Sequence, residues 1–215
     1  MSEAATRDRI VEAADRLFYH QGYEHTSFAD IAQAVGISRG NFYYHFKTKD
    51  QILDAVIGQR MANTLWMLDC WERAGKTPVD RILGFVHLLI ANQADILLYG
   101  CPVGTLSGEL AKLNHPARDD ANGLFTLFRA WLRRQFAHLG RAADADALAL
   151  HLLARSQGVA TLASALRDAP FVEQEVARME AWLRSVAQGT DAGTDTDANV
   201  DAPAPRLPEQ GPTRT

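Results

Sequence analysis

The chain has 215 residues, 47% of them hydrophobic and 22% charged, and a formal net charge of -4. This length can bury a substantial core in one domain or two small ones. The only cysteines, Cys70 and Cys101, lie far apart, which excludes a disulfide framework and suits a reducing compartment. The first ten residues contain no apolar segment like that of a secretory signal, and runs such as ILGFVHLLI are too short to span a membrane. We therefore expect a soluble cytoplasmic protein.

The overall acidic charge comes mostly from the C-terminal tail. Residues 189–215 hold five acidic residues and two arginines, a net charge of -3, which leaves -1 for residues 1–188. This tail has almost no apolar bulk to offset the entropy of ordering, so we expect it to be disordered. By contrast, residues 38–49 contain three basic residues and no acid. The local field there favours phosphate binding even though the total charge does not.

The first predicted element is a helix from about Thr6 to His20. Apolar residues recur along it at helical spacing, at Ile10, Ala13, Ala14, Leu17 and Phe18. Gly22 ends the helix, because glycine tolerates the positive φ that often follows a last turn. No stretch shows a convincing alternation of apolar and polar residues, so we predict an all-α fold.

Two short helices joined by a tight turn follow. Ser27 is predicted to cap the first helix together with Asp30, three residues later, and Gly36 suits the sharp turn that ends it. Ser38 caps the second helix, in which Phe42 and Phe46 lie four residues apart and face inward. This arrangement is a helix-turn-helix whose recognition helix runs from Ser38 to His45.

The outward face of this motif carries groups that bind nucleic acid. Arginine can bond guanine and asparagine can bond adenine in bidentate fashion, and Gly40 between them allows close backbone approach. The aromatic and basic residues that follow suit phosphate and sugar contacts, and hydroxyls and Lys49 lie at predicted helix N-termini. The predicted DNA-binding residues are Thr26, Ser27, Ser38, Arg39, Gly40, Asn41, Tyr43, Tyr44, His45, Lys47 and Lys49.

Residues 8–57 resemble the N-terminal DNA-binding domain of the TetR family of transcriptional regulators. The portion GISRGNFYYHFKTKDQIL carries most of this resemblance, through Gly36, Gly40, Tyr43, His45, Phe46 and Lys49 in order. The chain departs from some relatives at Phe28, Ala29 and Asp30, where a basic residue would add a phosphate contact. The resemblance implies a DNA-binding domain at residues 1–48, a helical effector-binding and dimerisation domain at 49–188, and the tail at 189–215.

The second domain is predicted to contain six helices. Thr77, Pro78 and Asp80 form a strong helix start, and Cys101 and Pro102 form another. The predicted helices run from about Lys49 to Gly75, from Pro78 to before Gly100, from Pro102 to before Asn114, and over 117–139, 144–166 and 170–187.

The resemblance implies that the last two helices form a dimer interface. Small residues would allow close helix approach there, and apolar residues would supply buried area, at Ala154, Gly158, Leu162, Ala165, Val176, Met179 and Leu183. The alternative is that these stripes only complete the core of the monomer.

A small-molecule effector would bind among the helices of the second domain. The candidate ligand-binding residues are Trp66, Cys70, His87, Cys101, Phe125, Trp131, His151 and Arg155. The resemblance implies a homodimer that binds a near-palindromic operator, most often as a repressor, and needs no cofactor.

Three other functions stay open. Cys101 at a predicted helix N-terminus could react with oxidants or electrophiles, because a thiol pKa can fall there. A helical protein that has lost its operator is the second alternative, and an enzyme is the third. The seven histidines show no metal-ligand spacing, and no nucleophile elbow or phosphate-binding glycine loop occurs.

Overall fold

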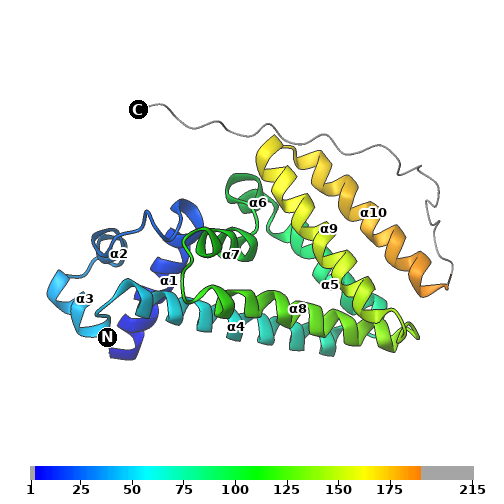
Figure 1. Cartoon of the computed structure of the whole chain (residues 1–215), viewed down its shortest axis with the longest axis horizontal. Coiled ribbons are helices and arrows are strands. Elements are labelled where there is room, and N and C mark those ends of the chain that lie inside the picture. The colour runs from blue at the N-terminus through cyan, green and yellow to red at the C-terminus, as the bar shows by residue number, and fades with distance from the viewer. Residues whose placement is uncertain (1–2, 190–215) are drawn as a thin grey trace.

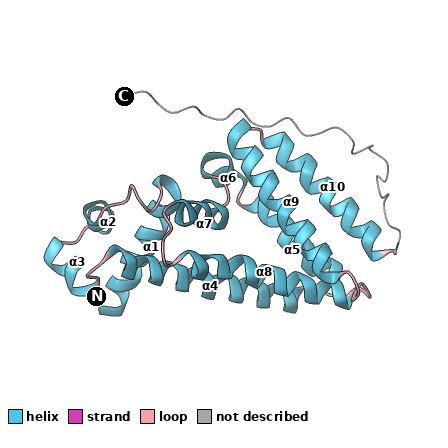
Figure 2. Ribbon diagram, in the orientation of Figure 1, coloured by secondary structure: helices cyan, strands magenta, loops and turns pink. Residues whose placement is uncertain are grey.

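The computed structural model describes residues 3–189 and, within that range, consists of helices and loops without strands (Figure 2). This confirms the predicted all-α class. The helices are α1 (Glu3–Gln21), α2 (Phe28–Val35), α3 (Arg39–His45), α4 (Lys49–Ala74), α5 (Pro78–Ala91), α6 (Gln93–Tyr99), α7 (Pro102–Lys112), α8 (Arg118–His138), α9 (Ala145–Leu166) and α10 (Ala169–Ala187). Apart from Gly189, the predicted tail lies outside the described residues.

The molecule is elongated, with α1 to α3 at one end and α5, α9 and α10 at the other (Figure 1). Helix α4 begins at the first end and runs along the molecule beside α8. Helix α8 packs on α9, α10 packs on α5, and α7 contacts both α1 and α8. We call α1 to α3 the head and α4 to α10 the body.

The apolar residues form two cores. The body core joins α5, α8, α9 and α10, with Trp131 almost fully buried in it. The head core joins α1 to α3 with the first two turns of α4, and it also takes in Leu106 and Leu110 of α7. Helix α7 is therefore packed into the head as well as into the body. The domain boundary between residues 48 and 49 stays a prediction.

The long helix expected from Pro78 to before Gly100 is in fact two helices, α5 and α6. The break falls at Asn92, whose backbone leaves helical geometry at φ -109° and ψ 16°. Its side-chain amide donates a hydrogen bond to the carbonyl of Leu88, at 2.9 Å. The expectation of one helix was wrong because a short polar side chain competes with the backbone for hydrogen bonds. The apolar pattern continues across the break and conceals it.

Candidate nucleic-acid interface and internal cavity

The α2–α3 hairpin is built by local capping, as the sequence predicts. The Ser27 hydroxyl accepts a hydrogen bond from the backbone N–H of Asp30, and the Asp30 carboxylate accepts one from the N–H of Ser27, which completes a capping box. Gly36 ends α2 in the left-handed conformation at φ +72°, and Ser38 caps α3 by accepting from the N–H of Asn41. The direction of α3 is thus set by residues inside the motif.

Two phenylalanines fix which face of α3 points outward. Phe42 is 1% exposed and Phe46 is 2% exposed, and both lie in the head core. The Phe42 ring also contacts Phe28 of α2, with ring centroids 5.1 Å apart. Because these two residues point inward, the first turn of α3 and Tyr43 face solvent.

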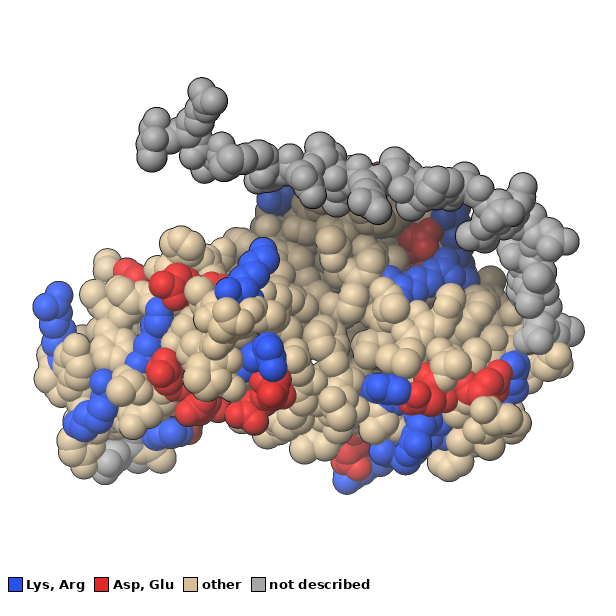
Figure 3. All heavy atoms as spheres, viewed as in Figure 1, with Lys and Arg blue, Asp and Glu red and all other residues tan. Residues whose placement is uncertain are grey.

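The exposed face holds most of the predicted DNA-binding residues. Arg39, Gly40 and Asn41 are exposed, and Tyr43 and Tyr44 expose 46% and 65% of their surface. Ser27, Arg39 and Tyr43 also line a hollow of about 290 Å³ between α2 and α3. Lys and Arg side chains appear along the outer edge of this end of the molecule, and Asp and Glu side chains gather towards its middle (Figure 3).

Two predicted contact residues are positioned differently from the rest. Thr26 is 1% exposed, and its hydroxyl donates to the carbonyl of Gly22 at 2.7 Å, so the expectation that this hydroxyl lies at the surface was wrong. The Lys49 ammonium donates to the carbonyls of Tyr23 and Glu24 at 2.9 and 3.1 Å. It also lies 4.3 Å from the centre of the Tyr23 ring. Both residues stabilise the turn between α1 and α2.

Three further predicted contact residues near α3 are only partly exposed or already make a contact within the chain. His45 is half-buried in the last turn, and its ring contacts that of Tyr44. The exposed Lys47 donates from its ammonium to the carbonyl of Tyr43. Ser38 is exposed, and its hydroxyl accepts the capping bond described above.

A second set of contacts joins the head to the body at the same turn. The two carboxylate oxygens of Glu109, on α7, accept hydrogen bonds from the backbone N–H groups of Tyr23 and Glu24, each at 2.9 Å. The Tyr19 hydroxyl of α1 donates to the carbonyl of Gly100, just before α7, at 2.6 Å. Helix α7 and its flanks therefore hold the turn that precedes the helix-turn-helix.

A polar cluster lies beside these contacts. The Tyr23 hydroxyl donates to Asp50 Oδ1 at 2.6 Å and lies 3.3 Å from His115 Nε2. The N–H of Ala117 donates to His115 Nδ1, so Nε2 is the nitrogen that carries a proton in the neutral ring. The hydrogen bond from Tyr23 lowers the pKa of Asp50. Burial and the same bond raise the pKa of Tyr23.

A partly open cavity of about 460 Å³ lies between the body and α1. Its walls come from α1 and from α4 to α9, and most lining side chains are apolar, among them Phe85, Leu89 and Phe128. Thr64 and Gln157 also line it, and neither side chain has a hydrogen-bond partner among the described residues. The cavity can accept an apolar molecule with a few hydrogen-bonding groups.

Two of the three charged residues at the cavity wall, Arg60 and Asp15, pair with each other, and the third, Arg16, is exposed. Arg60 of α4 donates to Asp15 of α1, at 2.6 Å, and to the carbonyl of Pro102, at 2.7 Å. The Arg60 side chain is 11% exposed, so this pair is mostly removed from solvent. It joins one wall of the cavity directly to the head.

Two of the eight predicted ligand-binding residues, Cys101 and Phe125, line the cavity. Trp131 is 1% exposed and lies against Trp71 in the body core, with ring centroids 5.6 Å apart. The remaining five are outside the lining: Trp66 is 70% exposed, Cys70 is half-buried, His87 pairs with Glu180, His151 lies on the Trp182 ring and Arg155 pairs with Glu175.

Sequence reasoning missed the residues of α4 that line the cavity. Arg60, Asn63, Thr64 and Met67 all line it and recur along α4 at helical spacing. This stripe, mixed in polarity, is the signal that could have found them. Trp66 is out of phase with the stripe and points away from the cavity, into solvent.

The predicted dimer residues divide into two groups. Ala154, Gly158, Leu162 and Ala165 are exposed on one face of α9. The other three, on α10, lie in the body core, with Val176 5% exposed and Met179 and Leu183 fully buried. The surroundings of these three residues fit the alternative, in which they complete the core of the monomer.

No group of three or more His, Cys, Asp or Glu side chains in residues 3–189 is arranged to hold a metal ion. In the same range no single helix is long and apolar enough to cross a membrane, and only the bent pair 78–91 and 93–112 meets those criteria jointly.

Comparisons with known proteins agree with this geometry. Residues 10–56 match the model of the N-terminal domain of bacterial regulatory proteins of the tetR family. The HTH-type transcriptional regulator of the lacX 3′ region of Lactococcus lactis is 25% identical over 85% of this chain and 95% of its own length. The HTH-type transcriptional repressor DhaR of Mycobacterium sp. (strain GP1) is 25% identical over 74% and 82%.

A solved structure extends the likeness to the body. The crystal structure of a TetR transcriptional regulator from Chloroflexus aurantiacus is 26% identical and covers 84% of this chain and 95% of its own, with a TM-score of 0.74. The similarity thus includes the helical body as well as the helix-turn-helix. This chain belongs to the TetR family of bacterial transcriptional regulators, which bind DNA.

Proposed function

We propose that the chain is a homodimeric repressor that binds a near-palindromic operator through α3 and leaves it when a small molecule occupies the body cavity. The observation that carries the proposal is that one cavity is walled by α1 and α4, and both helices also contribute residues to the head core. A molecule bound there contacts the parts of the chain that orient α3. The similarity to a named repressor, DhaR, supports repression as the mode of action.

The DNA-binding step rests on the exposed first turn of α3. Arg39 and Asn41 point into solvent on a helix whose opposite face is anchored by Phe42. In the major groove, these two side chains offer bidentate hydrogen bonds to guanine and adenine, each with a discrimination of about 1–3 kcal/mol. Tyr43, Tyr44 and Lys47 flank them and would contact the phosphates.

The dimer step rests on the exposed face of α9. Leu150, Leu162 and Leu166 expose 42%, 49% and 64% of their surface on this helix. Ala154 and Gly158 lie on the same exposed face and have little side chain to keep a partner helix away. An apolar face with a small-residue centre suits packing against its own copy about a twofold axis. Two copies would place their α3 helices about 34 Å apart, in successive major grooves.

The release step requires a difference in ligand affinity between two states of the dimer. A ligand that binds both states equally shifts nothing, however tightly it binds. The Arg60–Asp15 pair and the Glu109 contacts join cavity and head, so a ligand that changes the position of α4 or α7 alters the head as well. Only a state with the two heads correctly spaced binds the operator.

The DNA-binding step is tested with an operator selected from a random DNA pool by the full chain. Arg39→Ala should weaken binding to it by about 1–3 kcal/mol for each half-site and relax base preference at one position. Glu173→Gln, an exposed substitution on α10, is the control and should bind normally. Normal affinity and base preference for Arg39→Ala would place the reading surface elsewhere.

The dimer step has its own measurement. Sedimentation of the wild-type chain at micromolar concentration should give a dimer, and Leu162→Glu with Leu166→Glu should give a folded monomer. Leu98→Glu changes an equally exposed leucine on α6 and should leave the dimer intact. A wild-type monomer, or a dimer unaffected by the α9 double substitution, would refute the proposed interface.

A further inference from the structure

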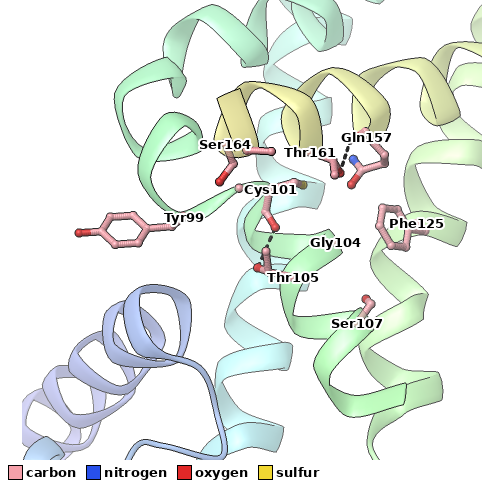
Figure 4. A pocket seen from close by; sticks show the side chains of 12 residues that line it. Tyr99, Cys101, Gly104, Thr105, Ser107, Phe125, Gln157, Thr161 and Ser164 are labelled. Carbon is pink, nitrogen blue, oxygen red and sulfur yellow. Dashed lines mark hydrogen bonds between the residues drawn. The ribbon is translucent and has the colours of Figure 1, made fainter. Parts of the chain in front are cut away.

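A second hollow lies beside the body cavity, between α7 and α9, with a volume of about 640 Å³ (Figure 4). We call this hollow the cleft. Three residues, Cys101, Phe125 and Gln157, line both the cleft and the cavity, so the two spaces adjoin. The cavity is mostly apolar, whereas the described side chains that line the cleft include hydroxyls and an amide but no charged group.

One side chain in the cleft lacks the partner that its burial calls for. Ser107, on α7, is 7% exposed, and its hydroxyl makes no hydrogen bond with any described residue. Buried hydroxyls are nearly always paired, because an unpaired one loses its hydration without compensation. The hydroxyls of Thr105 and Thr161 are instead used locally, donating to the carbonyls of Cys101 and Gln157 (Figure 4). Ser107 is therefore the group that needs a partner beyond those that residues 3–189 provide.

Gln157 lies at the boundary between the cleft and the cavity. Its side-chain oxygen lies so close to Gly104 that a Cβ added there would approach it to 2.6 Å. The glycine leaves room for the Gln157 amide in the orientation that it has here. No hydrogen bond holds this amide within the described residues, and its three side-chain torsions let it turn toward either space.

We propose that the cleft and the cavity form one two-part binding site for an elongated, uncharged molecule. The apolar body of this molecule occupies the cavity, and a hydroxyl-bearing or amide-bearing head group occupies the cleft. Ser107 and Gln157 bind the head group. This inference rests on the proposed function, which places the effector in the cavity, and it adds the chemical class of that effector.

The absence of charge is what selects an uncharged head group. A charged head that reaches the buried Ser107 hydroxyl would lose hydration there with no opposite charge to pair with, which is costly. Within the cavity, Arg60 is already bonded to Asp15 and to a carbonyl, and the remaining charged residue of the lining, Arg16, is exposed on α1. Hydroxyls and amides both donate and accept, as an uncharged sugar or amide head group requires.

The test uses the full chain and three probes with the same eight-carbon chain, titrated calorimetrically below the concentrations at which they form micelles. The probes are octyl β-glucoside, octyl sulfate and octyltrimethylammonium, and 1-octanol reports on the apolar part alone. We expect the glucoside to bind at least 10-fold more tightly than either charged probe. Ser107→Ala should weaken glucoside binding about 5-fold, the value of one hydrogen bond, and leave 1-octanol binding unchanged.

Three further variants separate the possible outcomes. Thr126→Ala, on an exposed part of α8, removes a hydroxyl outside both spaces and should leave all four affinities unchanged. Val103→Phe and Leu88→Phe fill the cavity from two half-buried positions and should weaken 1-octanol and the glucoside together. If 1-octanol still binds normally to both filled variants while they melt like the wild type, the cavity is not the site and the proposed function fails.

The two-part site is overturned by other results. Glucoside binding that is absent, that is no tighter than that of the charged probes, or that is unaffected by Ser107→Ala removes the head-group assignment. Ala165 belongs both to the cleft and to the proposed dimer face. If Ser107→Ala changes the dimer dissociation constant and leaves glucoside affinity unchanged, the cleft is part of the interface and the inference is wrong.

Discussion

Replacing Glu109 tests whether α7 fixes the head to the body. Its carboxylate accepts from the N–H groups of Tyr23 and Glu24, each at 2.9 Å. Hydrogen bonds to a charged acceptor contribute about 1.5–3 kcal/mol each, and the lower value applies because the bond from Glu24 is exposed. Glu109→Ala should therefore cost about 3 kcal/mol of unfolding free energy. Glu109→Gln, which keeps one acceptor oxygen, should cost about 2 kcal/mol.

Urea denaturation and amide hydrogen exchange measure this effect independently. With a denaturant slope of about 3 kcal/mol/M, a loss of about 2 kcal/mol lowers the midpoint by about 0.7 M for Glu109→Gln. The amides of Tyr23 and Glu24 should exchange faster in the same variant, because each loses a charged acceptor. The matched control is Glu173→Gln on α10, whose side chain is exposed and should leave the midpoint unchanged.

An unchanged midpoint together with unchanged exchange at Tyr23 and Glu24 would refute the bridging role of Glu109. A lower midpoint without faster exchange at these amides would assign the loss to another part of α7. Operator binding adds a third readout. If Glu109 only stabilises the fold, affinity for the operator should be unchanged at a temperature where Glu109→Gln is fully folded.

Three further predictions follow from the same structure. Phe42→Ala should cost about 3–5 kcal/mol in thermal or urea unfolding, because it empties the centre of the head core, and a loss below about 1 kcal/mol would contradict this packing. The lowered pKa of Asp50 gives stability that is complete above its ordinary pKa of about 3.9 and is lost as pH falls further, so Tyr23→Phe should flatten the stability curve below about pH 4. A stability curve of wild-type shape would show that Tyr23 does not hold this pKa. If Cys101 senses electrophiles, mild oxidation should lower operator affinity in the wild type and leave Cys101→Ser unaffected; equal responses would exclude that role.

The head could be predicted from sequence because its geometry follows from local rules. Ser27, Gly36 and Ser38 act on their own or adjacent turns, and the structure places each where its chemistry indicates. The positions of the Thr26 and Lys49 side chains did not match the predicted DNA contacts. Both side chains bond to backbone carbonyls of residues 22–24, in the turn after α1. For a basic or hydroxyl residue near a helix N-terminus, the sequence does not distinguish a side chain that faces solvent from one that bonds to the nearby backbone.

The body was less predictable, because helical periodicity shows which face of a helix is apolar but not which other helix packs against that face. Met179 and Leu183 form a regular apolar stripe, which suits a dimer interface as well as a monomer core, and the structure places them in the core. The exposed stripe of Leu162 and Leu166 on α9 has the same period, and no element within residues 3–189 covers it. Which stripe is covered depends on the packing of α5 against α10, a contact between residues about 90 positions apart.

Helix α7 connects the two functional regions of the molecule. Its first residues and Cys101 border the cavity and the cleft, while Glu109 near its other end holds the turn before α2. At about 1.5 Å per residue, its 11 residues form a rod of roughly 16 Å, short enough to move as one piece. A ligand that displaces the first turn of this rod therefore also displaces the carboxylate that fixes the head. Residues that line the cavity and the cleft and the residue that holds the turn before the helix-turn-helix thus share one short helix, which is the physical basis for the coupling proposed between effector and operator.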